Sequence, residues 1–274
     1  MRILLSFCLG LMGLTSISNA QETPTNDLKL YVFDCGSIHF PDLDNFSTSG
    51  DFAGKSSTFA ATCYLIRHKD GDLLWDFGLP FEFLSKELVF GDEQSMSLKE
   101  TLVDQLARID ITPDEIEYLS ISHSHFDHTG QITDFSTPTW LVNEKEINFM
   151  FSTEQLSKTY AGFKNLKKNV FEKDYDVFGD GSVMILDTPG HTPGHTVLQV
   201  MLPETGPVLL TGDLYHQTMS RELKRVPRFN FDEPQTRQSI DRFEKIADEL
   251  NANVIIQHEK MDIDKLPKIP AYLK

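Results

Sequence analysis

The sequence predicts a single-domain α/β protein in which helices cover β-sheets. Two observations support this prediction. Segments with strand character outnumber helical segments, and the helical segments are interspersed among the strands along the whole chain. Interleaved helices pack onto sheets, whereas helices confined to one stretch would form a separate lobe. The chain of 274 residues shows no linker and no short-period repeat, so residues 21–274 are expected to form one domain.

The first part of the chain is predicted to form antiparallel strands. Residues 30–36 and 60–68 are rich in β-branched and aromatic residues, and an Asp-Gly turn leads into a third strand over 72–78. The stretch 37–58 is rich in Gly, Ser, Asp and Phe. It is too long for a passive turn, so we expect it to be a lid or an arm that contacts a partner.

Helices and strands alternate through the rest of the chain. Leucines at a spacing of four predict an amphipathic helix over 97–109, and a long amphipathic helix is predicted over 233–250. Further strands are predicted over 118–122, 139–143, 182–190, 196–202, 207–213 and 253–258.

Composition and charge exclude several classes of protein. With 40% hydrophobic and 24% charged residues, the chain is neither disordered, nor collagenous, nor a multi-span membrane protein. The net charge of −16 repels phosphate backbones and anionic lipid. We therefore expect neither nucleic acid nor, after removal of the signal peptide, a membrane as a partner.

Residues 1–20 have the form of a secretory signal peptide. One basic residue precedes an apolar run over 3–14, and small residues stand at Ser18 and Ala20. The run is shorter than the roughly 20 residues that span a bilayer. We predict cleavage before Gln21 and export to the periplasm or the medium, and the alternative is an N-terminal anchor.

Two cysteines remain in the mature chain, Cys35 and Cys63, and an exported protein meets an oxidising compartment. If the strands that carry them are antiparallel neighbours, the two thiols fall nearly opposite each other and within reach of a disulfide bond. The alternative is a pair of buried free cysteines that act as small apolar residues.

A short histidine-rich loop contains the residues best suited to bind metal ions. His123, His125, Asp127 and His128 follow the strand over 118–122 directly. In extended backbone, residues two apart point the same way, so His123 and His125 can bind one ion while the next two residues face a second. Imidazole and carboxylate suit zinc and related divalent ions. The alternative, a cluster of surface histidines, carries a desolvation and repulsion cost without an ion.

This loop and three later motifs resemble the metallo-β-lactamase fold superfamily. The motifs are His123-x-His125-x-Asp127-His128, Thr188-Pro-Gly-His191-Thr-Pro-Gly-His195, Thr211-Gly-Asp213, and His258 at a strand end. Their order and the flanking stretches LYVFDCG, LLWDFG and LLTGDLYH are most similar to the N-acyl homoserine lactonase family, over about residues 28–260. The resemblance implies an αββα sandwich, with two mixed sheets packed face to face and helices on the outside.

The resemblance also implies a centre for two divalent metal ions. One ion would be held by His123, His125 and His191 and the other by Asp127, His128 and His258, with Asp213 bridging them. The histidine at position 195 would support this set, and Asp76 would orient a ligand imidazole, unless it only caps a turn. The ligands favour zinc, and iron, cobalt or manganese fit the same residues.

A bridged pair of ions can share one water and lower its pKa. The resemblance therefore implies a metal-dependent hydrolase that opens the lactone ring of N-acyl homoserine lactones, a quorum-quenching reaction, by attack of a metal-bridging hydroxide. Asp127 would pass a proton to the leaving group. Alternatives are a broader lactonase or arylesterase, a β-lactamase, thioesterase or phosphotriesterase of the same fold, and a di-iron redox protein. No Gly-x-Ser-x-Gly elbow and no phosphate-binding loop compete with this site.

Tyr215 is the remaining catalytic candidate. Lactonases of this family have a tyrosine shortly after the bridging aspartate, commonly one residue further along than Tyr215. We expect the Tyr215 hydroxyl to stabilise the oxyanion, and the alternative is a half-buried tyrosine bonded to a backbone carbonyl. We expect His216 to be an ordinary loop histidine, and the alternative is that it lines the pocket.

The substrate and partner expectations follow from the aromatic residues and the resemblance. The small-molecule lactone or ester would lie in an apolar groove, and the alternative for the aromatic residues is core or oligomer packing. The candidate groove residues are Phe40, Phe46, Phe52, Phe59, Phe77, Phe81, Phe83 and Phe90. The resemblance and the arm over 37–58 suggest a homodimer.

Overall fold

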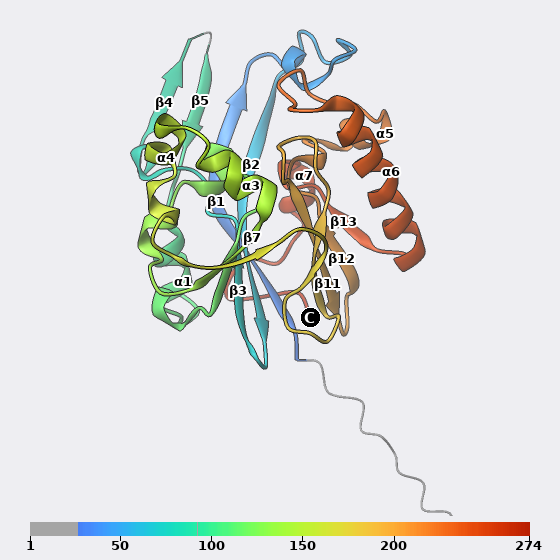
Figure 1. The fold of residues 1–274 in the computed structure, drawn as a ribbon. Helices are drawn as coiled ribbons and strands as arrows, with labels where there is room; N and C mark the ends of the chain where they lie inside the picture. Colours follow the sequence, from blue (N-terminus) through green and yellow to red (C-terminus); the bar gives the residue numbers. More distant parts are fainter. Residues whose placement is uncertain (1–26, 92) are drawn as a thin grey trace, which may run out of the picture.

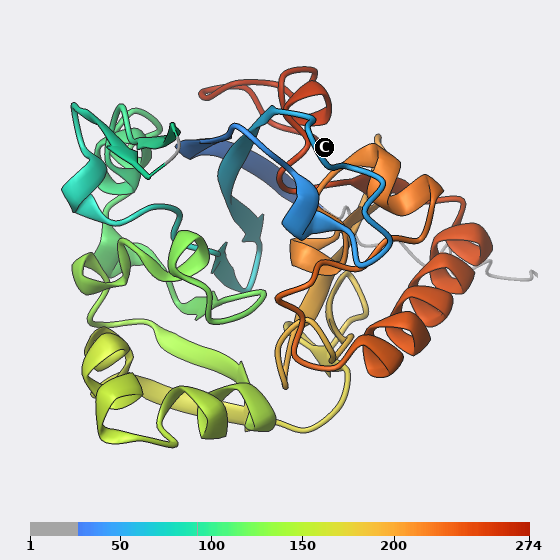
Figure 2. The ribbon, with the colours of Figure 1, turned by 90° about the horizontal axis from the view of Figure 1, so that it is seen from above.

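The computed structural model describes residues 27–91 and 93–274, so the predicted signal peptide lies outside the described residues. The chain forms four layers in the order helices, sheet, sheet, helices, as Figure 1 and Figure 2 show. The predicted αββα sandwich is therefore confirmed.

The larger sheet has eight strands and is mixed. Its first five strands pair antiparallel, and its last four pair in parallel, with β3 common to both parts. In spatial order the strands are β4 (Glu87–Phe90), β5 (Gln94–Ser97), β1 (Lys29–Phe40), β2 (Ser57–His68), β3 (Gly71–Trp75), β6 (Tyr118–Ser120), β7 (Thr139–Asn143) and β8 (Lys167–Phe171).

The smaller sheet has five strands and is also mixed, because β12 and β13 pair in parallel while the others pair antiparallel. In spatial order the strands are β13 (Asn253–Ile255), β12 (Gly206–Leu210), β11 (Thr196–Leu202), β10 (Val183–Asp187) and β9 (Tyr175–Asp176). Val32, Tyr64 and Leu73 of the larger sheet pack against Ile185 and Leu198 of the smaller one, and these contacts join the two sheets through one core.

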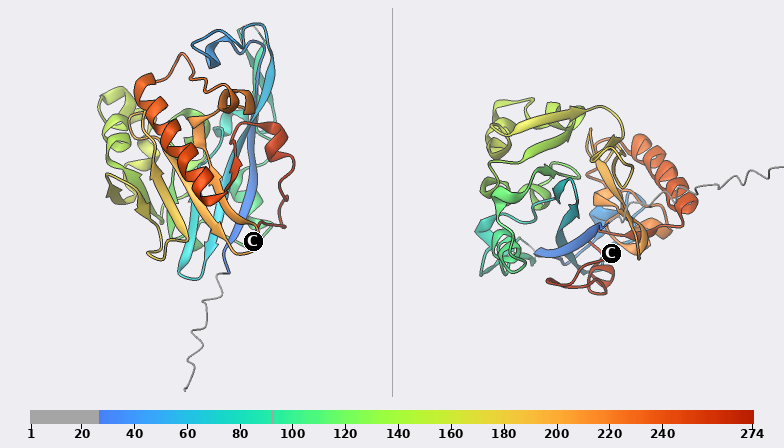
Figure 3. Two further views of the ribbon diagram at one scale, coloured as in Figure 1. Left: turned by 90° about the vertical axis from the view of Figure 1, so that its right-hand side faces the viewer. Right: turned by 90° about the horizontal axis from the view of Figure 1, so that it is seen from below.

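Helices cover both outer faces. On the larger sheet, Leu102 and Leu106 of α1 are buried against Leu65 and Leu74. On the smaller sheet, Ile240 and Phe243 of α6 are buried against Val197 and Leu209, and Figure 3 shows α6 lying along this sheet. The helices are α1 (Leu102–Ala107), α2 (Phe126–Thr129), α3 (Glu144–Met150), α4 (Glu154–Thr159), α5 (Thr218–Glu222), α6 (Glu233–Leu250) and α7 (Lys260–Ile263).

The two predicted helices had different outcomes. The helix predicted over 233–250 matches α6, which Asp232 caps and which ends at Asn251 in the left-handed conformation. The helix predicted over 97–109 is wrong at its start, because α1 begins only at Leu102, after the N-cap Thr101.

Of the two alternatives left open for Cys35 and Cys63, the structure shows the disulfide bond, and the two residues lie on the neighbouring antiparallel strands β1 and β2. Among the described residues, no helix combines the length and the apolar character that crossing a membrane requires.

Residues 41–56, between β1 and β2, pack onto their own chain. The backbone N–H of Thr48 donates to the carbonyl of Val226 at 2.9 Å, and the N–H of Arg228 donates to the carbonyl of Asn45 at 2.8 Å. We call residues 41–56 the arm. It forms one wall of the pocket described below. The stretch predicted over 37–58 is shorter than expected, because residues 37–40 belong to β1 and residues 57–58 belong to β2.

Candidate metal centre

Strand ends bring the predicted metal ligands together. His123 follows β6, His191 follows β10, Asp213 follows β12 and His258 follows β13. Because both sheets end their strands near one another, residues up to 135 positions apart in the chain meet at one site.

The seven predicted ligands form two clusters that meet at one carboxylate. The ligand atoms of the first, His123, His125, His191 and Asp213, all lie within 4.8 Å of one another, as do those of the second, Asp127, His128 and His258. In the first cluster, Nδ1 of His125 lies 2.9 Å from Nε2 of His123 and 3.1 Å from Nε2 of His191.

The carboxylate of Asp213 lies between the clusters. Its Oδ2 is 3.4 Å from Nε2 of His123 and 3.2 Å from Nε2 of His191. Its Oδ1 is 3.2 Å from Nε2 of His128 and 2.8 Å from Nε2 of His258. Each oxygen therefore faces one cluster, which is the arrangement that a bridging ligand requires.

Hydrogen bonds on the far side of the imidazoles direct Nε2 of two histidines into the site. Nδ1 of His128 lies 3.0 Å from Oδ2 of Asp76, and Nδ1 of His258 lies 2.7 Å from the carbonyl of Ala60. When Nδ1 donates to these oxygens, Nε2 carries the lone pair that a metal ion needs. Asp76 thus occupies the orienting position that the resemblance implies.

Asp76 also ties together three further groups. Its carboxylate accepts hydrogen bonds from the backbone N–H of Ser122 at 2.6 Å, from the Ser122 hydroxyl at 2.9 Å and from Nε2 of Gln257 at 2.7 Å. Ser122 and Gln257 are the chain neighbours of His123 and His258, so one buried carboxylate fixes ligands from both sheets.

His195 lies behind the site rather than in it. Its Nε2 accepts a hydrogen bond from the backbone N–H of Asp213 at 3.0 Å, and its Nδ1 lies 3.1 Å from the carbonyl of Thr188. Both ring nitrogens are therefore used, and the structure places His191 rather than His195 in the cluster.

The imidazoles and carboxylates shift each other's pKa values strongly. Burial lowers the pKa of His125 to about 4, and the neighbouring His191 adds to this shift. Burial also lowers the pKa of His128, but Asp213, Asp76 and Asp127 outweigh it and raise that pKa well above its usual value. Four histidines outweigh the effect of burial on Asp213 and hold its pKa well below the usual range.

The residues fit two divalent metal ions. Nε2 of His128 and Oδ1 of Asp213 are buried and make no hydrogen bond within the described residues. Buried polar atoms without a partner are rare, and here they lie between the imidazoles and carboxylates of the two clusters. This donor set is the one that zinc and related ions prefer.

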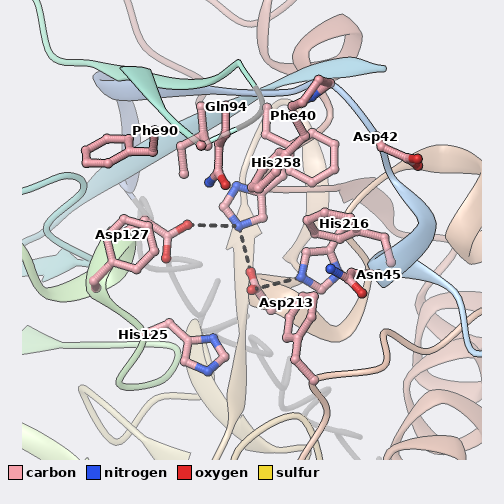
Figure 4. Close-up of a pocket in the computed structure, with 17 residues that line it drawn as sticks. Phe40, Asp42, Asn45, Phe90, Gln94, His125, Asp127, Asp213, His216 and His258 are labelled. Carbon is pink, nitrogen blue, oxygen red and sulfur yellow. Dashed lines mark ion pairs between the residues drawn. The ribbon is translucent and has the colours of Figure 1, made fainter. Parts of the chain in front are cut away.

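A pocket of about 650 Å³ opens onto these clusters. Figure 4 shows Asp213 at its base, with His258 and His216 on either side and Asp127 and His125 facing them. The walls are largely aromatic: Phe40, Phe46 and Phe59 meet edge to face, and Phe59 stacks on His258. Only part of the predicted aromatic groove lies here: Phe52, Phe77 and Phe83 are buried in the core, and Phe81 does not line the pocket either.

The structure does not place Tyr215, the predicted oxyanion donor, at the pocket. The Tyr215 hydroxyl donates to Glu244 of α6 at 2.7 Å, and the ring is buried against Phe243 outside the pocket. The next residue, His216, faces the pocket instead, with Nε2 3.1 Å from Oδ2 of Asp213. His216 therefore lines the pocket, which is the alternative to the expected ordinary loop histidine.

Comparisons with known proteins agree with this geometry. The family model described as the metallo-beta-lactamase superfamily matches residues 57–258. The N-acyl homoserine lactonase AttM of Rhizobium johnstonii is 28% identical over 267 residues, covering 90% of this chain and 98% of the relative. The N-acyl homoserine lactonase AttM of Rhizobium radiobacter is 31% identical over 184 residues, covering 62% of this chain and 68% of the relative.

Solved structures give the same result. An N-acyl homoserine lactone hydrolase, solved with the product N-hexanoyl-L-homoserine at its catalytic metal centre, has a TM-score of 0.77 and 26% identity. The match covers 89% of this chain and 98% of that chain. This chain belongs to the metallo-beta-lactamase superfamily and, within it, to the N-acyl homoserine lactonase family.

Proposed function

We propose that this protein is a dinuclear metal-dependent hydrolase that opens the lactone ring of N-acyl homoserine lactones, and so quenches quorum signals. One observation carries the proposal: the two oxygens of Asp213 face two separate clusters of metal ligands at the base of an aromatic pocket. The named activity of the relatives supports the choice of substrate.

Two bound divalent ions would supply Lewis acidity and an activated water at neutral pH. His123, His125 and His191 would hold one ion, Asp127, His128 and His258 the other, and Asp213 both. Asp127 lies at the pocket wall as well as in its cluster, so its carboxylate can carry a proton toward the leaving alkoxide of an opened ring.

The pocket walls suit the acyl chain of such a substrate. Phe40, Phe46 and Phe229 provide apolar surface, and the polar groups gather at the base near Asp213. A ligand with a polar ring and an apolar tail therefore binds with its ring at the ligand clusters. β-Lactams, thioesters, phosphotriesters and aryl esters are the competing substrate classes on the same fold.

The test is base consumption during hydrolysis of a long-chain N-acyl homoserine lactone. We expect turnover by the metal-replete protein, loss of turnover after chelation and recovery after metal is returned. A panel with one β-lactam, one thioester, one phosphotriester and one aryl ester measures specificity. Full activity of metal-stripped protein, or faster turnover of another class, would contradict the proposal.

We propose zinc as the native metal, because all seven ligands are imidazoles or carboxylates, two side-chain types that zinc accepts in both clusters. Elemental analysis of protein purified without added metal is expected to give two zinc ions per chain. Iron, cobalt or manganese in place of zinc would contradict the choice of metal and leave the reaction unaffected.

We propose that the protein is exported, after cleavage before Gln21, to the periplasm or the medium. The disulfide bond between Cys35 and Cys63 supports this proposal, because such bonds persist in oxidising compartments. Cell fractionation with N-terminal sequencing of the mature protein tests it. An uncleaved N-terminus in the cytosolic fraction would contradict export.

We also propose a homodimer, which rests on the family resemblance. The arm folds onto its own chain, where Arg225 and Arg228 pair with Asp51 and Asp44, so it does not carry the dimer proposal. Size-exclusion chromatography with light scattering tests it, and a mass of one chain at micromolar concentration would contradict it.

A further inference from the structure

Glu146, in the first turn of α3, links the two loops that carry the first ligand cluster. Its side chain is buried, with 2% of the residue exposed. Oε1 accepts a hydrogen bond from the backbone N–H of Ser124 at 2.7 Å. Oε2 accepts from the Thr192 hydroxyl at 2.8 Å and from the backbone N–H of Gly194 at 2.9 Å. One carboxylate therefore spans segments of the chain that are otherwise far apart in sequence.

Two of the three donors lie next to histidines of the first cluster. Ser124 stands between His123 and His125, and Thr192 follows His191. Fixing the backbone at Ser124 and Thr192 thus fixes the starting points of all three imidazoles. The ligands of the second cluster have a separate buried acceptor, because His128 and Gln257 are held by Asp76.

Close packing keeps Glu146 in place. A Cβ atom at Gly194 would lie 2.4 Å from the backbone N of Glu146 and 2.7 Å from Oδ1 of Asn143. Asn143 caps α3 and donates from Nδ2 to Oδ1 of Asp187, at the end of β10. The start of α3 therefore packs directly against the loop that carries His191, and glycine at 194 permits this close approach.

Burying the Glu146 carboxylate costs free energy of desolvation. Among the described residues, no Lys, Arg or His forms an ion pair with Glu146. A buried carboxylate without a cation is costly and persists only when hydrogen bonds offset its desolvation. All the bonds that do so here run to the two histidine-bearing loops.

We propose that Glu146 is a positioning residue for the first cluster: it holds the two loops at the separation at which His123, His125 and His191 converge, and it thereby sets the affinity of this cluster for its ion. The inference rests on the metal centre proposed above. It assigns Glu146 to the first site alone, whereas Asp76 contacts His128 of the second site and also Ser122, beside His123 of the first.

Glu146→Gln tests the inference in the full-length mature protein, with Glu144→Gln as the matched control on the exposed side of the same helix. The glutamine amide keeps one oxygen that can accept hydrogen bonds from one loop. Its NH₂ group faces a donor of the other loop and cannot accept, so only one of the two loops stays bonded. Stepwise zinc affinities are measured by chelator competition. We expect one affinity to fall about tenfold or more in Glu146→Gln, the range for outer groups around metal ligands, and the other to stay unchanged.

Two readouts identify the affected cluster. Amide hydrogen exchange of the metal-free protein is expected to accelerate at Ser124 and Gly194 and to stay unchanged at Ser122, which Asp76 holds. Crystals of Glu146→Gln grown with limiting zinc are expected to show anomalous signal at the second cluster only.

Equal zinc affinities in wild type, Glu144→Gln and Glu146→Gln would overturn the inference. So would an equal loss at both ions, because that would indicate a general loss of structure. If Glu146→Gln does not fold, Thr192→Val removes one bond only and is expected to weaken the same ion to a smaller extent. A wild type that binds two ions but hydrolyses no lactone would refute the proposed function and leave this comparison valid.

Discussion

The hydroxyl of Tyr215 donates a 2.7 Å hydrogen bond to Glu244, and this bond turns the tyrosine away from the pocket and toward α6. Glu244 also accepts from Arg221 at 2.8 and 2.9 Å, so Tyr215 belongs to a polar link between α5 and α6. Burial, reinforced by Glu244, raises the pKa of Tyr215 above its usual value, so this hydroxyl stays protonated and acts as a donor.

Tyr215→Phe is therefore expected to leave catalysis nearly unchanged. It removes one hydrogen bond while Arg221 continues to pair with Glu244, so the free energy of unfolding should fall by about 1 kcal/mol. Steady-state kinetics and urea unfolding check both expectations. A tenfold or greater loss of kcat with normal metal content would show that Tyr215 takes part in catalysis.

His216→Ala is expected to lower kcat/KM by about tenfold or more, the scale of a positioned proton donor or acceptor. His216 lines the pocket and stacks on His258, with Nε2 beside Asp213, so its ring can donate a hydrogen bond to a substrate oxygen. His216→Gln keeps a donor and is expected to recover part of the loss. Zinc content should stay at the wild-type level. A lost ion would identify His216 as a ligand instead.

Local chain geometry explains why the sequence pointed to the wrong neighbour. Tyr215 has extended backbone, with φ −140° and ψ 136°, and successive side chains in extended backbone point in opposite directions. His216 therefore faces the pocket when Tyr215 faces α6. The turn over Gly212–Leu214 sets which of the two faces inward, and no pattern in the sequence specifies that turn.

Features with a local or strongly periodic signal could be predicted. The long amphipathic pattern gave the bounds of α6, and the histidine loop with its later motifs gave all seven residues that the structure brings together. The start of α1 could not be predicted, because Leu98 pairs with Leu84, a contact distant in sequence. Glu146 was missed for the same reason, since its partners lie 22 and 46 residues away.

Arg225→Ala and Arg228→Ala are each expected to raise KM for long-chain lactones by a few fold. These arginines pair with Asp51 at 2.5 Å and Asp44 at 2.9 Å, and they hold the arm whose Phe46 lines the pocket. Such partly exposed ion pairs contribute only about 0–1 kcal/mol, so the free energy of unfolding should change little.

The matched control for the arm variants is Lys224→Ala, which removes an ion pair with Asp241 outside the arm. It is expected to leave KM unchanged for every chain length. Short-chain substrates should be affected less than long-chain ones by the arm variants. An equal rise in KM for all chain lengths would contradict a role of the arm in holding the acyl chain.

The metal-free protein is expected to lose stability as the pH falls below about 6.5, partly through His195. Burial, with a contribution from His191, lowers the pKa of His195 to about 3. In the unfolded chain this pKa is about 6.5, so the unfolded state binds the proton first. The contribution of neutral His195 is complete above about pH 6.5 and is lost as the pH falls toward 3.

His195→Gln isolates this effect, because other histidines of the site titrate in both variants. Between about pH 4 and pH 6 the free energy of unfolding of wild type should fall more steeply, by up to about 1.4 kcal/mol per pH unit. Urea unfolding of metal-stripped protein at several pH values measures both slopes. Parallel slopes would show that His195 takes up no proton on unfolding in this range.

Reduction of the Cys35–Cys63 bond is expected to lower the free energy of unfolding by about 3 kcal/mol, because the bond closes a loop across 28 positions in the unfolded chain. The double variant Cys35→Ala/Cys63→Ala should show the same loss and no further sensitivity to reductant. Denatured, unreduced mature protein should titrate no thiol. Because the bond joins β1 to β2 in the middle of the larger sheet, its loss should lower stability without changing KM, since neither cysteine lines the pocket. Two reactive thiols in unreduced protein would contradict the bond itself.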